Sequence, residues 1–78
     1  MTLRIISAED ILFEGTVAAV TLPGSEGAFT VLSHHASLIS TLASGEVRYV
    51  MDGGAEKRVN IEGGIVDVDN DIVSVCVY

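Results

Sequence analysis

Apolar and polar side chains alternate most regularly in the second half of the chain. Apolar residues occupy every second position over 46–51, 58–62, 66–69 and 73–77. This two-residue period indicates half-buried β-strands. The glycine pairs Gly53-Gly54 and Gly63-Gly64 and the run Asp69-Asn70-Asp71 separate these segments and are typical of tight turns. The second half is therefore predicted to be a meander of short strands.

The first half of the chain follows a less regular pattern. Val17 and Val20 are three positions apart, so they share one face of a strand only if a β-bulge inserts a residue around Ala18-Ala19. Between Val31 and Leu42 the apolar spacing also suits a helix, and periodicity alone favours that interpretation there.

Composition narrows the fold class. The 78 residues allow one domain at most, and with 49% hydrophobic and 19% charged residues the chain can bury enough surface to fold. Tryptophan is absent and aromatic residues are few, so Val, Ile and Leu must fill the core. Short strands at close spacing predict an all-β fold over residues 1–78: a flattened β-sandwich or barrel of about ten short strands.

Net charge excludes two classes of partner. Eleven acidic and four basic residues give a formal charge of −7, which repels a nucleic-acid backbone. An anionic lipid surface is disfavoured for the same reason. The sequence also has no apolar run near the ~20 residues that a membrane helix needs, and no export signal. We expect neither nucleic-acid binding nor direct insertion into lipid.

His34 and His35 are the first candidates for site chemistry, as ligands of a metal-dependent enzyme that also uses Glu26. Adjacent histidines on extended backbone point to opposite faces, and no nearby Cys or further His completes a zinc site. The single cysteine, Cys76, cannot form an internal disulfide, and its place in a valine-rich run predicts a small packed side chain. We therefore expect no metal site.

The remaining polar motifs are also better explained by structure than by chemistry. The loop Pro23–Gly27 lacks the Gly-Lys-Ser/Thr ending of a phosphate cradle, and no Gly-x-Ser-x-Gly elbow marks a hydrolase. Asp67, Asp69 and Asp71 lack the loop of a calcium site, which predicts a solvated sheet edge. We expect no catalytic residue and no cofactor.

One segment, from Val17 to Leu38, is too irregular to be generic β-sheet sequence. Its paired valines lead into Pro-Gly-Ser-Glu-Gly, then an apolar pair, then His-Ala-Ser-Leu. It resembles the amino-terminal domain of the epsilon subunit of F-type ATP synthases. Further matches cover essentially the whole chain: Leu3-x-Ile5-x-Ser7-x-Glu9 and Phe13-Glu14-Gly15 fit the family's opening strand and first turn, and Gly45–Arg48 and Gly63–Val68 fit its later hairpins.

The resemblance implies a β-sandwich with a turn near His35 and a strand over about 37–42. It also implies two partners. The loop after the paired valines would contact the c-ring of the membrane sector, with Ala28 where the family frequently has a polar or charged residue, so that Glu26 is its only charge. The gamma subunit would be contacted near Ser7, His35 and Ser40. The candidate c-ring contacts are Ser25, Glu26, Gly27, Ala28 and Phe29.

The function implied is that of a central-stalk subunit, which grips gamma, docks the stalk on the c-ring and couples rotation to ATP synthesis without catalysis of its own. It would be a peripheral protein on the cytoplasmic face of the bacterial inner membrane. The helical hairpin that usually follows the sandwich is missing from these 78 residues, so we expect neither inhibition of hydrolysis nor ATP sensing. The alternative is a free-standing β-sandwich module that binds a ligand or peptide through residues 23–29.

Overall fold

The computed structural model describes all residues 1–78 and contains eight β-strands and no helix. In chain order the strands are β1 (Thr2–Ile6), β2 (Ile11–Leu22), β3 (Phe29–Leu32), β4 (Leu38–Leu42), β5 (Gly45–Met51), β6 (Glu56–Ile61), β7 (Gly64–Asp69) and β8 (Ile72–Val77). The all-β class is confirmed, but the expected number of about ten strands is wrong. The first turn lies at Ser7–Asp10, and Phe13-Glu14-Gly15 continues β2, which runs unbroken for 12 residues.

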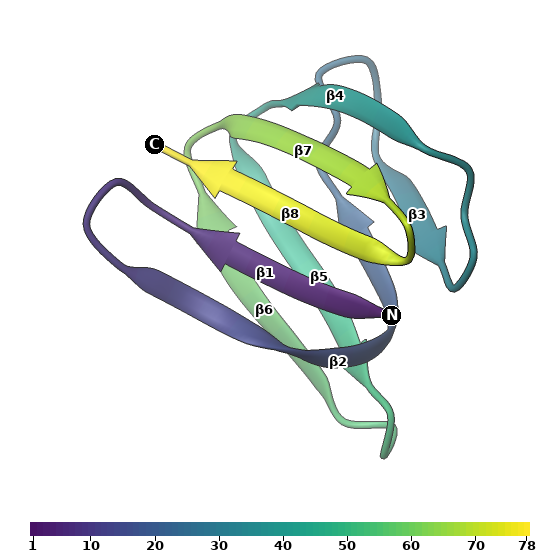
Figure 1. Cartoon of the computed structure of the whole chain (residues 1–78). Coiled ribbons are helices and arrows are strands. Elements are labelled where there is room, and N and C mark those ends of the chain that lie inside the picture. The colour runs from purple at the N-terminus through teal and green to yellow at the C-terminus, as the bar shows by residue number, and fades with distance from the viewer.

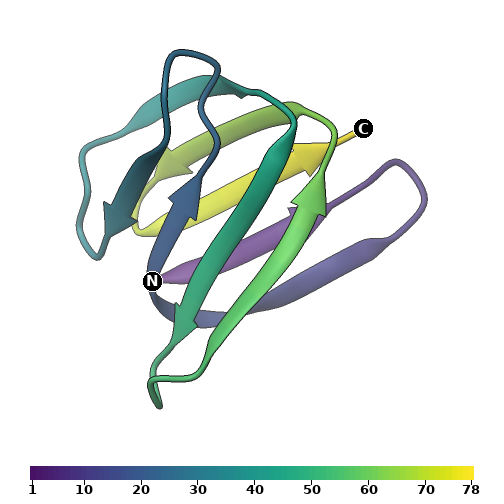
Figure 2. The same cartoon turned by 180° about the vertical axis from the view of Figure 1, so that it is seen from behind.

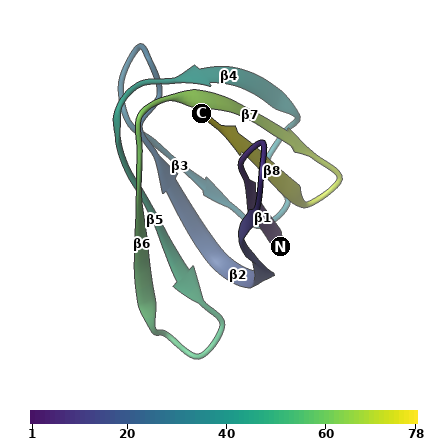
Figure 3. The same ribbon diagram turned by 90° about the vertical axis from the view of Figure 1, so that its left-hand side faces the viewer.

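The strands form two layers that share β2. Their hydrogen-bonded order is β4-β7-β8-β1-β2-β5-β6, and β3 also pairs with β2. Figure 1 shows β4, β7, β8 and β1 in front of β5 and β6, and Figure 2 shows the same arrangement from behind. From the side, β5 and β6 lie opposite β1 and β8 (Figure 3). We call the β4-β7-β8-β1 sheet, with the beginning of β2, the first layer, and the sheet of β3, β5, β6 and the end of β2 the second layer.

β2 passes between the layers because its two halves have different neighbours. Its first half pairs with β1, and its second half pairs with β3 and β5. The register with β5 shifts between Val17 and Ala19, which confirms the predicted bulge. The extra residue lets Val17 and Val20 both point inward, and both are fully buried.

The segment 38–42 is a strand and not a helix. β4 pairs antiparallel with β7 from Leu38 opposite Val68 to Leu42 opposite Gly64. The apolar spacing that favoured a helix arises because Leu38 and Leu42 face inward while Ile39 faces solvent. The strand implied by the resemblance is therefore confirmed, and the helical interpretation is wrong.

A core of valine, isoleucine and leucine fills the space between the layers. Phe13 and Tyr49 pack together at one side with ring centroids 4.4 Å apart, and burial raises the pKa of Tyr49. No buried side-chain nitrogen or oxygen lacks a partner. The buried residues are Leu3, Ile5, Val17, Val20, Leu22, Val31, Leu42, Val47, Tyr49, Ile61, Val66, Val68, Val73, Val75 and Val77.

Cys76 is exposed, contrary to the packed side chain expected for it. In β8 the inward positions are Val73, Val75 and Val77, so Ser74 and Cys76 take the outward parity. The run 73–77 is mostly valine, but its valines occupy only the inward positions, so the apolar composition of the run did not indicate that Cys76 faces solvent.

Candidate functional site

The loop between β2 and β3 is attached to the end of β4. The Ser25 N–H donates to the Thr41 carbonyl at 3.0 Å, and the Ala43 N–H donates to the Pro23 carbonyl at 2.8 Å. The Thr41 hydroxyl donates to Ser25 Oγ at 2.9 Å. These contacts join segments 16 or more residues apart, so the loop has a defined shape.

The side chains at the tip of this loop point to solvent. Ser25, Glu26, Gly27 and Ala28 are exposed, and Glu26 is the only charge among them. Phe29 is half-buried and packs against the core. Its ring also lies on Gly24, where an added Cβ would be 2.9 Å from two ring carbons. The tip is thus a polar surface on an apolar support, and of the five predicted c-ring residues Phe29 is the one that belongs partly to the core.

The three residues predicted to contact gamma do not form one patch. Ser7 follows β1, where its N–H donates to the Asp10 carbonyl at 2.8 Å. His35 lies before β4 at the opposite end of the first layer, and Ser40 is half-buried within β4. The structure therefore places Ser7 and His35 at two ends of the same sheet.

An apolar face lies on the outside of the first layer and was not predicted from the sequence. Ile65, Cys76, Ile6 and Ile11 are neighbours in one cross-strand row through β7, β8, β1 and β2. Ile39 and Ile72 are 71% and 45% exposed at outward positions of β4 and β8. We call these residues the outer apolar face: Ile6, Ile11, Ile39, Ile65, Ile72 and Cys76. Their parity, opposite to the buried valines, is the signal that would have revealed the face.

A polar row crosses the outer apolar face between Ile72 and the row that contains Ile65 and Cys76. By register it consists, next to Ile39, of Asp67, Ser74, Arg4 and Glu14. Arg4 and Glu14 form an ion pair of 2.8 Å, whereas Asp67 is exposed and takes part in no ion pair. A shallow groove beside Ile39 follows β4 and β7 and is lined by Ser37, Leu38, Ile39, Asp67, Val68 and Asp69. An open groove of this kind encloses little of a small molecule and is better suited to contact with a protein surface.

Asp67 and Asp69 are not on a sheet edge, contrary to expectation, because β7 lies between β4 and β8, and Asp71 lies in the turn between β7 and β8. The Asp71 carboxylate accepts the His34 N–H at 2.9 Å and lies 3.5 Å from the amino-terminal nitrogen. The His34 hydrogen bond is the main cause that lowers the pKa of Asp71, the nearby positive charge lowers it further, and partial burial opposes both. The carboxylate is therefore ionised at neutral pH.

His34 and His35 lie in a turn, so the extended backbone expected for them is wrong. His34 has a φ of 63°, and the His35 Nδ1 is 2.7 Å from the Ala36 carbonyl oxygen. No group of three or more His, Cys, Asp or Glu side chains is arranged to hold a metal ion.

The structure contains no helix long and apolar enough to cross a membrane.

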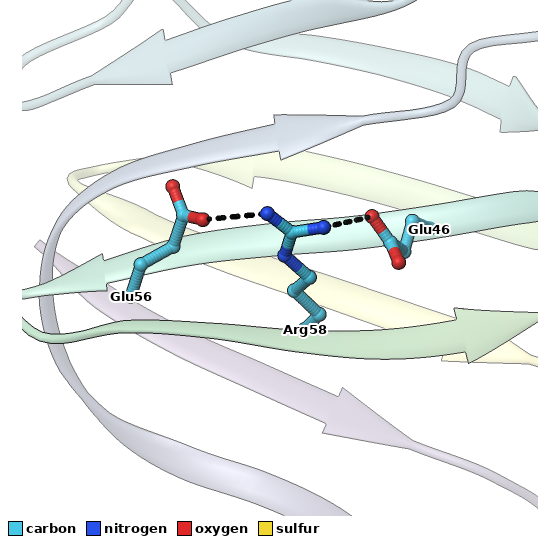
Figure 4. Close-up of polar contacts among 3 residues, drawn as sticks. All are labelled: Glu46, Glu56 and Arg58. Atoms are coloured by element: carbon cyan, nitrogen blue, oxygen red, sulfur yellow. Dashed lines mark hydrogen bonds and ion pairs between the residues drawn. The ribbon is translucent and has the colours of Figure 1, made fainter.

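The second layer carries most of the positive charge. Three of the four basic residues lie on β5 and β6, where Arg58 is 3.1 Å from Glu56 and 3.5 Å from Glu46 (Figure 4). Arg48 lies directly opposite Arg58 across the strand pair and has no ion pair of its own. The two layers therefore present chemically different outer faces.

Comparison with known proteins identifies the family. The model of the ATP synthase delta/epsilon chain β-sandwich domain matches residues 1–78. The ATP synthase epsilon chain of Leptospira borgpetersenii is 39% identical over 75 residues, which are 96% of this chain and 58% of that protein. The epsilon chain of Sulfurovum sp. is 42% identical over 71 residues, or 91% of this chain and 56% of that protein. The chain thus spans less than two thirds of the length of these relatives.

Solved structures agree with this result. A chain in the Euglena gracilis mitochondrial ATP synthase, in a structure that includes F1 and the c-ring, superposes with a TM-score of 0.90 at 26% identity, covering 96% of this chain and 48% of that one. A chain in the central stalk and c-ring of the Tetrahymena thermophila enzyme has the same fold, with a TM-score of 0.78 at 13% identity over 97% of this chain and 61% of that one. The chain belongs to the ATP synthase delta/epsilon β-sandwich family.

Proposed function

We propose that this chain acts in the central stalk of an F-type ATP synthase, as the β-sandwich of an epsilon subunit that binds gamma and docks the stalk on the c-ring. The observation that carries the proposal is the match to epsilon chains over 96% of these residues. The role we propose for the domain is mechanical. In a bacterium it would lie on the cytoplasmic face of the inner membrane, held there by the complex.

The β2–β3 loop is the proposed c-ring contact. Its backbone is hydrogen-bonded to Thr41 and Ala43, so the tip is held in place and can transmit force. The exposed residues of the tip would contact polar groups of the ring; they are Ser25, Glu26, Gly27 and Ala28. Phe29 supports the tip from within and contributes contact only through the exposed part of its ring.

The first layer is the proposed gamma contact. Ser7 and His35 mark its two ends, Ser40 lies in its edge strand β4, and the outer apolar face lies between the two ends. An exposed apolar surface of this kind on a small domain is typical of a protein-binding site. Burial of Ile39, Ile65 and Ile72 against gamma would then supply most of the affinity.

Matched substitutions on the two layers test this assignment. Ile39→Asp introduces a charge into the outer apolar face, and Leu32→Asp does the same at a residue of β3 that is 59% exposed in the second layer. We expect Ile39→Asp to weaken binding to the gamma subunit of the same organism by about tenfold or more, measured by calorimetry, with an unchanged circular dichroism spectrum. Leu32→Asp should bind as the unmodified chain does. Equal affinities for the two variants, or no binding of the unmodified chain, would contradict the proposal.

A further inference from the structure

The loop between β3 and β4 is held by two aspartates of the β7–β8 hairpin. The His34 N–H donates to Asp71 Oδ1 at 2.9 Å, and the Ser37 hydroxyl donates to Asp69 Oδ1 at 2.7 Å. These bonds link residues that are 37 and 32 positions apart. The hydrogen bonds made by His35 stay local, to Leu32 and Ala36. The two carboxylates therefore provide the long-range hydrogen bonds of this loop.

The loop takes a backbone conformation that needs such support. His34 has a φ of 63°, in the left-handed region that non-glycine residues rarely occupy. A conformation of this kind persists when surrounding contacts determine it. Asp71, which accepts the His34 N–H, has a φ of 62° itself and sits in the tight turn between β7 and β8. The turn between β7 and β8 thus holds the turn that contains His34.

These bonds do not serve the hydrophobic core. Every side chain from Ser33 to Ser37 is exposed, so no core packing depends on the shape of the loop. The loop instead determines where His35 lies and how the chain enters β4, whose second residue, Ile39, is 71% exposed. A loop whose conformation is already fixed favours binding, because no conformational entropy is lost in ordering the loop when the partner binds.

We propose that Asp69 and Asp71 are positioning residues, which hold the β3–β4 loop in the conformation that presents His35 and Ile39 to the gamma subunit. The inference rests on the proposed function for the identity of the partner, but not for the restraint on the loop. Asp52 lies in the turn between β5 and β6 of the second layer, is exposed, and accepts no hydrogen bond from the loop. It therefore provides a matched control.

Two substitutions at Asp71 separate the hydrogen bond from the backbone conformation. Asparagine and glycine both tolerate a positive φ, but only the asparagine side chain keeps an oxygen that can accept the His34 N–H. Asp71→Asn should therefore preserve the loop, and Asp71→Gly should release it. Ser37→Ala removes the second bond, and Asp52→Asn removes a carboxylate on the second layer, away from the loop and from the outer apolar face.

Amide hydrogen exchange measures the restraint directly. In Asp71→Gly the His34 amide should exchange about tenfold faster than in Asp71→Asn, while the Val75 amide in the core keeps its protection in both. If the released loop is in its native conformation about a tenth of the time, gamma affinity falls about tenfold, because the apparent Kd scales inversely with that fraction. Ser37→Ala should show a smaller change in the same direction, and Asp52→Asn should show none.

The outcomes separate the two proposals. Gamma affinity of Asp71→Gly equal to that of the unmodified chain, or a His34 amide as protected in Asp71→Gly as in Asp71→Asn, overturns the positioning role. A loss of affinity in Asp52→Asn as large as in Asp71→Gly also overturns it, because the effect would then come from charge alone. If the unmodified chain binds no gamma, the proposed function fails, and the exchange measurement still decides whether the aspartates hold the loop.

Discussion

Gly64 is the residue at which one added methyl group would do the most damage. It opens β7, and a Cβ there would overlap the carbonyl oxygen of Cys76 and lie 3.0 Å from Val77 Cα. Both are backbone atoms of β8, so relief requires the two strands to separate. We expect Gly64→Ala to lower the free energy of unfolding by about 3 kcal/mol or more. Gly53→Ala, with open space around it, should change it by less than about 0.5 kcal/mol. Urea unfolding measures both, and similar midpoints would contradict the structure.

Asp71 should make the stability of the domain depend on pH in acid. The His34 N–H, and then the amino-terminal charge, lower its pKa below the ordinary value of 3.8. A lowered pKa means that the carboxylate stabilises the fold at pH values above 3.8, and that this contribution is lost as the pH falls through the folded-state pKa. The melting temperature of Asp71→Asn should therefore fall less steeply with acidification than that of the unmodified chain. Parallel curves from about pH 5 down to pH 2 would show that the carboxylate has no such role.

At the scale of the element, β5 and β6 show how like charges can face each other at little cost. Arg48 and Arg58 are directly opposite, and Arg58 is balanced by Glu46 and Glu56, all on exposed side chains. Exposed ion pairs contribute little, and facing arginines repel each other. We expect Arg58→Gln to change the free energy of unfolding by less than about 0.5 kcal/mol. Arg48→Gln should be neutral or slightly stabilising by thermal unfolding. A large loss in Arg58→Gln would show that the two pairs outweigh the repulsion.

The sequence predicted the individual strands better than their partners. Alternation located the strands from β5 to β8, and the spacing of Val17 and Val20 predicted the bulge in β2. It did not reveal that β1 lies parallel to β8, or that β4 pairs with β7, because such pairings depend on packing between distant segments. The strand count was too high because a bulge bends a strand without ending it.

The candidate site was predictable only where it is local. The β2–β3 loop was located by its motif, since Pro23 and the glycines determine its turn within a few residues. The bonds from Asp69 and Asp71 to the β3–β4 loop join segments more than 30 residues apart, and nothing in the local pattern indicates them. The outer apolar face was missed because the isoleucines that form it come from separate strands and gather only when the first layer is assembled.

At the scale of the whole molecule, the domain has apolar surfaces on both sides of its first layer. The inner side packs against the second layer, which makes the body stiff because protein interiors contain few voids. On the outer side, Ile39, Ile65 and Ile72 are exposed to solvent. A formal charge of −7 opposes contact between two copies of the chain at neutral pH. Solubility of the isolated domain should thus depend on charge repulsion to offset an exposed apolar face.

The isolated chain should therefore self-associate near its isoelectric point of about 4.4, where repulsion disappears. The contact between Asp71 and the β3–β4 loop should persist there, because the pKa of Asp71 lies below 3.8 and its carboxylate still accepts the His34 N–H. Light scattering should rise between pH 7 and pH 4.4 while the circular dichroism spectrum stays constant. Ile39→Asn leaves the charge unchanged and should reduce the association, whereas Leu32→Asn, on the second layer, should not. Equal scattering from the two variants would show that association near the isoelectric point uses a surface other than the outer apolar face.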